Sequence, residues 1–199
     1  MYSKSINTLI DAFKKFPSVG QRTAERFIFY LLKSGKKEVG ELTLALKELI
    51  DNVKSCEVCW NFSDESPCPT CLNKNRDHSV ICVVADPQDL PAIEKTLVFH
   101  GAYHVLRGII EPGAEENLKK LKLRELFERA KKINVKEIIL ALNPDLSGEM
   151  TMLYLDKELK KINPKLKITR LARGLPMGSD LQYADEITLG SAIKNRTNR

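Results

Sequence analysis

The chain has 199 residues, 43% of them hydrophobic, and its 32 Lys and Arg against 26 Asp and Glu give a net charge of +6. No apolar run approaches the roughly 18 residues of a membrane span, so we exclude an integral membrane protein and expect a soluble, cytoplasmic one. The positive charge favours polyanionic partners only mildly, because a solvated basic surface explains it equally well.

The first part of the chain is expected to be entirely helical. Apolar residues recur at helical spacing in residues 6–13, 24–31 and 39–53, and Pro17 and Gly20 interrupt the pattern between the first two runs. The sequence therefore predicts helix, hairpin, helix, and then a third amphipathic helix.

The second of these helices combines a glycine start with a basic face. Gly20 directly precedes the helix, where free backbone N–H groups can hold a phosphate. Arg22, Arg26 and Lys33 fall within roughly 40° of one another around the helix axis, opposite the apolar face. The alternative is an ordinary amphipathic helix with a solvated outer stripe. If DNA binds here, it should do so without regard to sequence and with strong salt dependence.

Four cysteines follow in two Cys-x2-Cys pairs, separated by the eight residues 60–67. They are Cys56, Cys59, Cys68 and Cys71. Four thiolates at this spacing suit one structural Zn²⁺ per chain and leave no open coordination position for catalysis. The alternative, two disulfides, is less favoured because no hydrophobic signal segment is evident at the start and Cys82 is an odd fifth thiol.

Two aromatic residues, Trp60 and Phe62, lie between the cysteine pairs. They could stack a nucleobase, but so short a loop has little other apolar surface. We therefore expect them to form a miniature core within the zinc-binding segment.

Beyond the cysteines the pattern changes to alternating strands and helices. Residues 80–84 form a continuous apolar run, as expected of a strand buried on both faces of a sheet. Further strands are predicted at 103–106, 137–142 and 167–172, with helical pattern at 123–132 and 150–161 between them. Such alternation predicts an α/β fold with a mainly parallel sheet and ligand sites at the carboxyl ends of its strands.

Acidic residues follow two of these strands. Asp86, Asp145 and Glu149 could together hold Mg²⁺ for phosphoryl-transfer chemistry. Three acids are few for such a site, so helix capping by Asp145 or Ser147 and surface solvation are the favoured interpretation. No phosphate-binding loop and no His-Glu-x-x-His motif is present in the sequence.

The remaining titratable candidates are expected to have packing or hydrogen-bonding roles rather than to be ligands or catalytic groups. His78, His100 and His104 are scattered and have no neighbouring nucleophile in the sequence. Cys82 lies in an apolar run and is expected to be a small core residue.

Six features taken in order resemble the RecR family of bacterial recombination mediators along nearly the whole chain. They are FPSVG at 16–20, the four cysteines, AIEKT at 92–96, GAYHVLRG at 101–108, IILALNP at 138–144 and TRLARGLPMG at 169–178. The resemblance implies a helix-hairpin-helix region at 1–54, a four-cysteine zinc finger at 55–72, a Toprim domain at 79–174 and a C-terminal arm at 175–199.

The resemblance also implies a function. Proteins of this family are non-enzymatic DNA-repair factors that form homodimers or homotetrameric rings. They act with RecO and RecF at gapped or single-stranded DNA to help load the RecA recombinase. The alternatives are a Mg²⁺-dependent Toprim nuclease or topoisomerase, and a structural adaptor without DNA contact.

Several residues take roles from the motif match. Arg22 and Arg26 occupy positions that the family links to DNA contact. Catalytic Toprim relatives carry a Glu after the first strand and an acidic Asp-Pro-Asp-like loop, where this chain has Ala85 and Asn143. The likeness therefore argues against catalysis, and it suggests that Asp145 and Glu149 serve contact with a protein partner.

Overall fold

The computed structural model describes residues 2–113 and 115–196, and the last three residues of the predicted C-terminal arm lie outside this description. The chain divides into two compact units, Met1–Val53 and Lys54–Arg199. Among the described residues, no helix has the length and apolar character needed to span a membrane.

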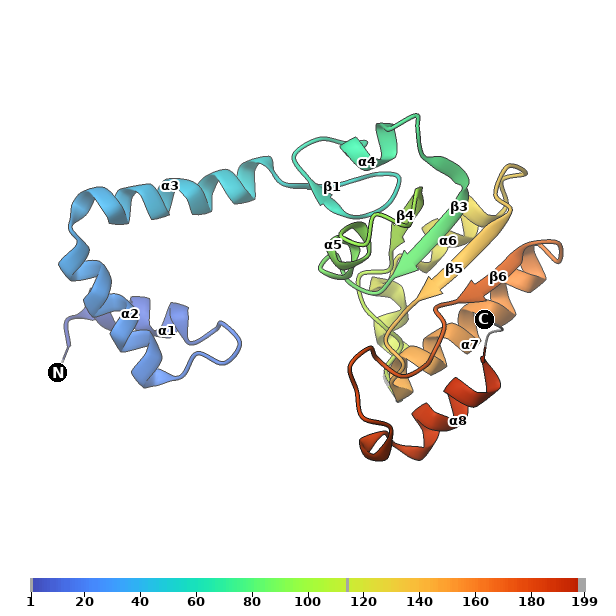
Figure 1. Cartoon of the computed structure of the whole chain (residues 1–199). Coiled ribbons are helices and arrows are strands. Elements are labelled where there is room, and N and C mark those ends of the chain that lie inside the picture. Colours follow the sequence, from blue (N-terminus) through green and yellow to red (C-terminus); the bar gives the residue numbers. More distant parts are fainter. Residues whose placement is uncertain (1, 114, 197–199) are drawn as a thin grey trace. The chain divides into compact units, whose positions relative to one another are not determined.

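The N-terminal unit is helical, as predicted (Figure 1). It comprises α1 (Lys4–Phe13), α2 (Gln21–Ser34) and α3 (Lys36–Asn52). Ser3 caps α1 by accepting a hydrogen bond from the Ile6 amide at 3.4 Å. The hairpin between α1 and α2 is closed by a small core of Ile10, Ala24 and Ile28.

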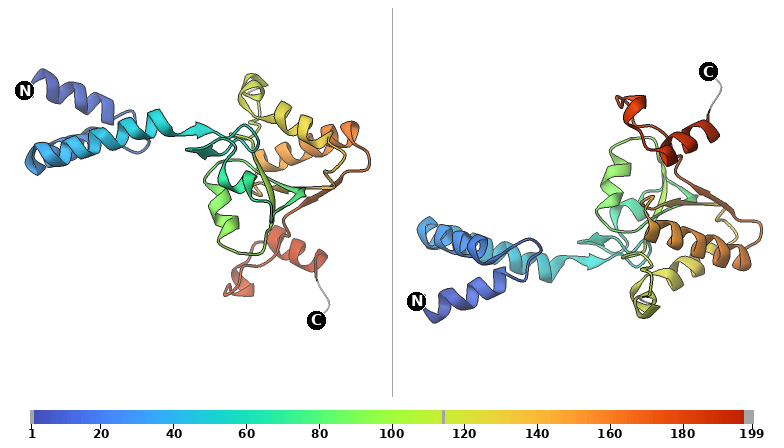
Figure 2. Two further views of the ribbon diagram at one scale, coloured as in Figure 1. Left: turned by 90° about the horizontal axis from the view of Figure 1, so that it is seen from above. Right: turned by 90° about the horizontal axis from the view of Figure 1, so that it is seen from below.

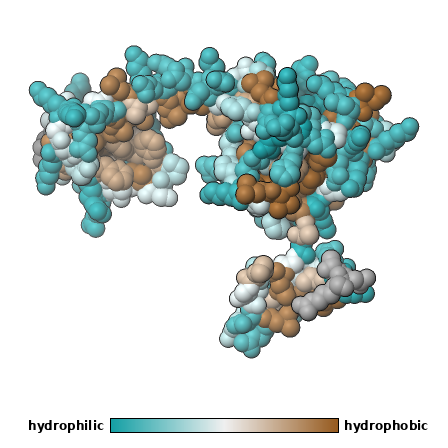
Figure 3. Space-filling view, turned by 45° about the horizontal axis from the view of Figure 1, so that its top comes forward, coloured by the Kyte–Doolittle hydropathy of each residue, from teal (hydrophilic) through white to brown (hydrophobic). Residues whose placement is uncertain are grey.

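The third helix differs from the first two because it buries none of its residues within the chain. Its exposed apolar side chains are Leu42, Leu44, Leu46, Leu49 and Ile50. Apolar side chains lie among hydrophilic ones on the surface of this unit (Figure 3). An exposed apolar face of this size is characteristic of a surface that contacts another molecule.

The second unit begins with the cysteine-containing segment. β1 (Lys54–Ser55) and β2 (Phe62–Ser63) pair as an antiparallel hairpin, and the short helix α4 (Pro69–Leu72) follows. Pro69 lies in the first turn of α4. Residues there make no N–H bond within the helix, so the missing N–H of proline costs nothing.

A parallel four-stranded sheet forms the centre of this unit, which confirms the predicted α/β fold. Its order is β4 (Gly101–Val105), β3 (Asp77–Val84), β5 (Glu137–Ala141) and β6 (Lys167–Arg170). All three neighbouring pairs are parallel.

Helices cover both faces of the sheet (Figure 2). α5 (Asp89–Glu94) lies on one face, and α6 (Leu123–Ala130) and α7 (Leu146–Ile162) lie on the other. Side chains of β3 alternate between the two resulting cores, with Ile81 and Val83 on the α6 and α7 side.

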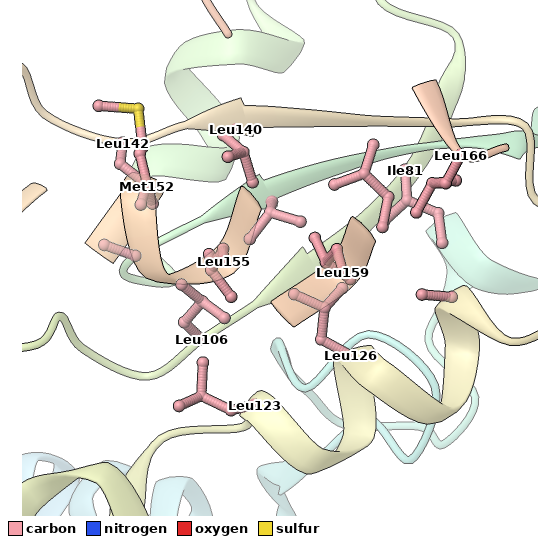
Figure 4. Close-up of a cluster of buried hydrophobic side chains, with 14 of the residues drawn as sticks. Ile81, Leu106, Leu123, Leu126, Leu140, Leu142, Met152, Leu155, Leu159 and Leu166 are labelled. Carbon is pink, nitrogen blue, oxygen red and sulfur yellow. The ribbon is translucent and has the colours of Figure 1, made fainter. Parts of the chain in front are cut away.

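The larger core packs α6 and α7 against the sheet (Figure 4). Leu155 and Leu159 of α7 and Leu126 of α6 lie beneath the strand residues Ile81 and Leu140. Leu126, Leu155 and Leu159 are completely buried. This packing fixes the start of α7, and with it Asp145 and Glu149, at the carboxyl edge of the sheet.

Two 3-10 helices and a final helix complete the described chain. They are η1 (Glu115–Lys120), η2 (Leu181–Tyr183) and α8 (Glu186–Lys194). The segment from η2 to α8 buries no residue and exposes large apolar side chains, among them Leu181, Tyr183 and Ile187.

Candidate metal centre and nucleic-acid interface

The four predicted metal ligands converge on one point. The Sγ atoms of Cys56, Cys59, Cys68 and Cys71 all lie within 4.8 Å of one another. The Cys56–Cys71 and Cys59–Cys68 sulfur pairs are 3.9 Å and 3.6 Å apart. A tetrahedral zinc ion with Zn–S bonds of about 2.3 Å requires sulfurs about 3.8 Å apart. The sulfur cage therefore fits zinc, and all four cysteines are free thiols rather than disulfides.

Local backbone bonds give the cage its shape. The Cys56 amide donates to the Asn61 carbonyl at 2.8 Å, and the Trp60 amide donates to the Cys56 carbonyl at 2.9 Å. Across the cage, the Cys68 amide donates to the Cys56 sulfur at 3.3 Å. Such a bond stabilises the thiolate form that a metal ion needs.

The electrostatics of the cage also call for a cation. The neighbouring Cys71 side chain is the main reason that the pKa of Cys59 falls to about 5. The same neighbour contact raises the pKa of Cys71, and burial raises the pKa of Cys68 to about 11. Zn²⁺ binds thiolates, so protons held by these thiols are released as the ion binds.

Arg107, which lies just after the end of β4, contacts the zinc-binding segment and so connects it to the sheet. Its Nε donates to the Trp60 carbonyl at 2.7 Å and its Nη2 donates to Ser55 Oγ at 3.0 Å. Its guanidinium carbon lies 3.5 Å from the centre of the Phe62 ring. Arg107 makes these contacts from a left-handed backbone conformation, with φ of 67°.

The predicted miniature core of Trp60 and Phe62 is therefore wrong. Trp60 packs against the smaller core of the sheet, and the Lys122 ammonium lies 4.1 Å from its ring centre. Phe62 is 53% exposed. The small core of the segment is instead formed by the buried cysteines Cys56, Cys59 and Cys68, and Trp60 buries its ring against the sheet.

The basic residues of α2 are exposed on one side of the helix. Among the residues that the structure describes, no ion pair involves Arg22, Arg26 or Lys33. Gly20 caps the helix without a side chain, and the first helical bond runs from the Ala24 amide to the Gly20 carbonyl at 2.9 Å. The amides before Ala24 are left for water or a ligand.

An open groove of about 1000 Å³ follows the same stripe. Besides the three cations, its lining includes the aromatic side chains of Tyr2, Phe27, Phe29 and Tyr30. The sequence interpretation missed these aromatic residues. The signal was present, because Tyr30 follows Arg26 by four residues and precedes Lys33 by three, the spacings that place helical residues on one side.

In the part of the chain that the structure describes, Asp86, Asp145 and Glu149 do not lie close enough together to share one metal ion. Asp145 caps α7 by accepting a hydrogen bond from the Gly148 amide at 2.7 Å, which confirms the capping interpretation. Glu149 pairs with Arg170 at 3.5 Å and with Arg173. Among the described residues, the cysteines are the only group of three or more potential metal ligands close enough to share an ion.

His104 and the fifth cysteine have the expected core roles, whereas His78 and His100 are exposed and His78 Nε2 lies 3.2 Å from the Asn73 carbonyl. His104 is fully buried, with Nε2 2.8 Å from the Lys122 carbonyl and Nδ1 3.3 Å from Arg129 Nη1. Burial lowers the pKa of His104 to about 3, so the ring is neutral. Cys82 is buried in the smaller core, and this burial raises its pKa to about 12.

These features define a class of protein: a helix-hairpin-helix unit joined to a four-cysteine zinc finger and a Toprim-type parallel sheet. Family models match the chain in the same order. They are the RecR helix-hairpin-helix at 6–50, the RecR four-cysteine zinc finger domain at 53–73, the Toprim domain at 79–172 and the RecR C-terminal model at 174–197.

Curated relatives match the chain along nearly its whole length. The chain is 47% identical to the recombination protein RecR of Bifidobacterium adolescentis over 98% of this chain and 96% of that one. It is 44% identical to recombination protein RecR of Gloeobacter violaceus over 98% of each. The chain belongs to the RecR family of recombination proteins, and its four cysteines form the zinc finger of that family.

Proposed function

We propose that this protein is a DNA-binding recombination mediator that performs no reaction itself. It binds gapped or single-stranded DNA through Gly20, Arg22, Arg26 and Lys33 and acts with RecO-like and RecF-like proteins to help load RecA. The observation that carries the proposal is the stripe of exposed, unpaired cations beside an open helix start, in a chain of the RecR family. Among the contacts described, no acidic side chain neutralises these cations, so they are free to bind phosphates.

The absence of catalysis is part of this proposal. Ala85 and Asn143 stand where catalytic Toprim relatives carry acids. Asp145 is engaged in a helix cap and Glu149 in ion pairs, so neither is free to take up Mg²⁺ without losing a stabilising contact. In the rival nuclease or topoisomerase, supercoiled or single-stranded DNA would be cut in the presence of Mg²⁺, and Asp145→Ala would abolish the cutting.

Asp145 and Glu149 are proposed to contact a protein partner. They lie at the start of α7 beside exposed apolar side chains, among them Leu146 and Leu153. Exposed apolar side chains beside charged groups are typical of a surface that contacts a protein.

Self-association into a homodimer or homotetrameric ring is also proposed. The exposed apolar side chains of α3 and of the segment from η2 to α8 support it, because they have no partner within the described chain. Copies in a ring would add their phosphate contacts and so strengthen binding to one DNA molecule. Light scattering with and without DNA measures the number of chains.

The DNA contact is tested with the double variant Arg22→Ala/Arg26→Ala. We expect weaker binding to every DNA sequence and a plot of log K against log salt that is shallower by about one for each arginine. The control is Lys160→Ala/Lys161→Ala, which removes the same charge from exposed positions of α7. Equal binding by both variants, or an unchanged salt slope in the arginine variant, would contradict the proposal.

A further inference from the structure

We propose that the groove along α2 holds unpaired nucleobases, with Tyr30 as the stacking platform between two phosphate-binding cations. The inference deepens the proposed function and rests on it, because it assumes that α2 is the DNA-contacting helix. What it adds is how a single strand is held: an unpaired base stacks on a side chain between the phosphate contacts.

Along one side of α2, three cationic side chains and one aromatic ring form a stripe. Arg22, Arg26, Tyr30 and Lys33 follow one another at intervals of four, four and three residues. At about 100° per residue, Tyr30 falls roughly 40° from Arg26 and 60° from Lys33 around the axis. The stripe from Arg22 to Lys33 spans about 16 Å at a rise of about 1.5 Å per residue. A ring flanked by cations on one helical face has the composition of a single-strand binding groove.

The ring of Tyr30 is available to a ligand. Tyr30 is 61% exposed, and its hydroxyl donates to Glu38 Oε1 at 3.2 Å, which anchors one end of the side chain. Phe29 and Tyr2 line the same groove and contact each other edge to face, with ring centres 5.4 Å apart. Among the described lining residues, the acidic one is Glu25, which accepts a hydrogen bond from Gln21 at 2.7 Å. Three cations against the carboxylates of Glu25 and of the neighbouring Glu38 leave the groove positive.

Core packing does not account for the position of the Tyr30 ring. The buried side of α2 is formed by Ala24 and Ile28, which lie on the other side of the helix from Arg22. An aromatic ring that stays exposed to water gains no stability from burial. The exposure of Tyr30 beside cations is therefore better explained by a ligand that covers the ring.

The positive charge of the groove favours a nucleic acid over a second copy of the chain as the bound molecule. A second copy of the chain meeting this surface through a two-fold axis would bring its own Arg22, Arg26 and Lys33 against these three, and like charges would repel. A nucleic acid brings phosphates to the cations and bases to the ring. Duplex DNA offers only the phosphates, because its base faces are already stacked, whereas a single strand offers both.

The test compares three probes by fluorescence anisotropy on the full-length, zinc-loaded protein: a thymine oligonucleotide, an abasic oligonucleotide of the same length and a duplex. We expect Tyr30→Ala to weaken binding of the thymine strand by about 5- to 150-fold, the range for loss of one base–aromatic stack, and to leave duplex binding unchanged. Wild type should prefer the thymine strand to the abasic one, and Tyr30→Ala should lose that preference.

Two variants act as controls. Tyr30→Phe removes only the hydroxyl bond to Glu38 and should bind as wild type does. Leu32→Ala removes an apolar side chain that is also 61% exposed, but outside the groove lining, and should leave all three affinities unchanged.

Several results would overturn the inference. They are equal loss of thymine-strand and duplex binding in Tyr30→Ala, equal binding of abasic and thymine strands by wild type, and a Tyr30→Phe variant as weak as Tyr30→Ala. A Tyr30→Ala variant that changes the number of associated chains and not the base preference would assign the ring to a second copy instead. Failure of the proposed function is a different outcome, in which the Arg22→Ala/Arg26→Ala variant binds DNA as wild type does.

Discussion

Arg107 connects the zinc finger to the sheet. Two substitutions at this position separate the contribution of its side-chain contacts from that of its left-handed backbone conformation. Arg107→Ala removes two hydrogen bonds and the contact with the Phe62 ring but keeps a Cβ at φ of 67°. Arg107→Gly removes the same contacts and also the Cβ. The difference between the variants therefore reports the backbone alone.

The magnitudes follow from these contacts. Two hydrogen bonds from a partly exposed charged donor contribute about 1 to 1.5 kcal/mol each, and the cation–π contact contributes about 0.5 kcal/mol, so Arg107→Ala should destabilise by about 3 kcal/mol. A left-handed conformation costs a residue with a Cβ about 1 to 2 kcal/mol, and glycine avoids this cost. Glycine also loses more chain entropy on folding, which cancels part of that gain and leaves about 1 kcal/mol. Arg107→Gly should therefore destabilise by about 2 kcal/mol.

Thermal unfolding followed by circular dichroism, with zinc in excess, measures both variants. For a chain of this size about 1 kcal/mol shifts Tm by 2–4 °C, so Arg107→Ala should melt about 6–12 °C below wild type and Arg107→Gly about 2–4 °C above Arg107→Ala. The chain has one tryptophan, Trp60, which lies in the junction, and its fluorescence should become easier to quench in both variants.

Lys157→Ala, which removes an exposed cation from α7, should change neither Tm nor quenching. The reasoning is refuted if Arg107→Gly melts at or below Arg107→Ala. It is also refuted if both variants keep the wild-type Tm and the wild-type quenching of Trp60.

The remaining predictions concern the zinc cage and a buried histidine. Cys71→Ser should lose the bound zinc and expose Trp60 to quencher, because structural zinc contributes about 10–16 kcal/mol in zinc fingers, whereas Cys82→Ala should keep one zinc per chain. Full zinc content in Cys71→Ser, measured by atomic absorption, would contradict this. For His104 the folded pKa of about 3 lies below the ordinary 6.5, so the unfolded state binds the proton first and stability falls as pH drops from about 6.5 toward 3. Urea unfolding at several pH values should show this loss with a slope of up to about 1.4 kcal/mol per pH unit, which His104→Phe lacks, and equal slopes in the two proteins would contradict it.

The elements of the fold could be predicted because each has a local signal. The strand at β3 is a continuous apolar run, α1 and α2 carry their apolar residues at helical spacing, and the zinc cage follows from the spacing of its cysteines. The capping role of Asp145 has a local signal too, because it immediately precedes the first residue of α7.

The contacts between elements could not be predicted in this way. Trp60 and Arg107 meet across 47 positions of sequence, and nothing near either residue indicates the other. For the same reason the sequence pattern does not reveal that Trp60 packs against the sheet and that the core of the zinc finger is formed by its cysteines. Glu149 is paired with Arg173, which belongs to the segment after β6 and has no local pattern linking it to α7.

The aromatic groove escaped prediction for another physical reason. An aromatic residue on an amphipathic helix is most often part of a core, and only the structure shows that Tyr30 is exposed while Ile28 fills the core position two residues earlier. Its spacing from Arg26 and Lys33 becomes informative once that exposure is known.

RecA loading tests the central claim most directly, namely that α2 holds DNA on a zinc-stabilised scaffold that performs no reaction. The measurement follows RecA filament growth on gapped DNA coated with single-strand-binding protein, in the presence of RecO, RecF and Mg²⁺. The account predicts that wild type accelerates loading and leaves the DNA intact, and that Arg22→Ala/Arg26→Ala does not accelerate it. Loading by the double variant at the wild-type rate, or cleavage of the DNA by wild type, would contradict the account.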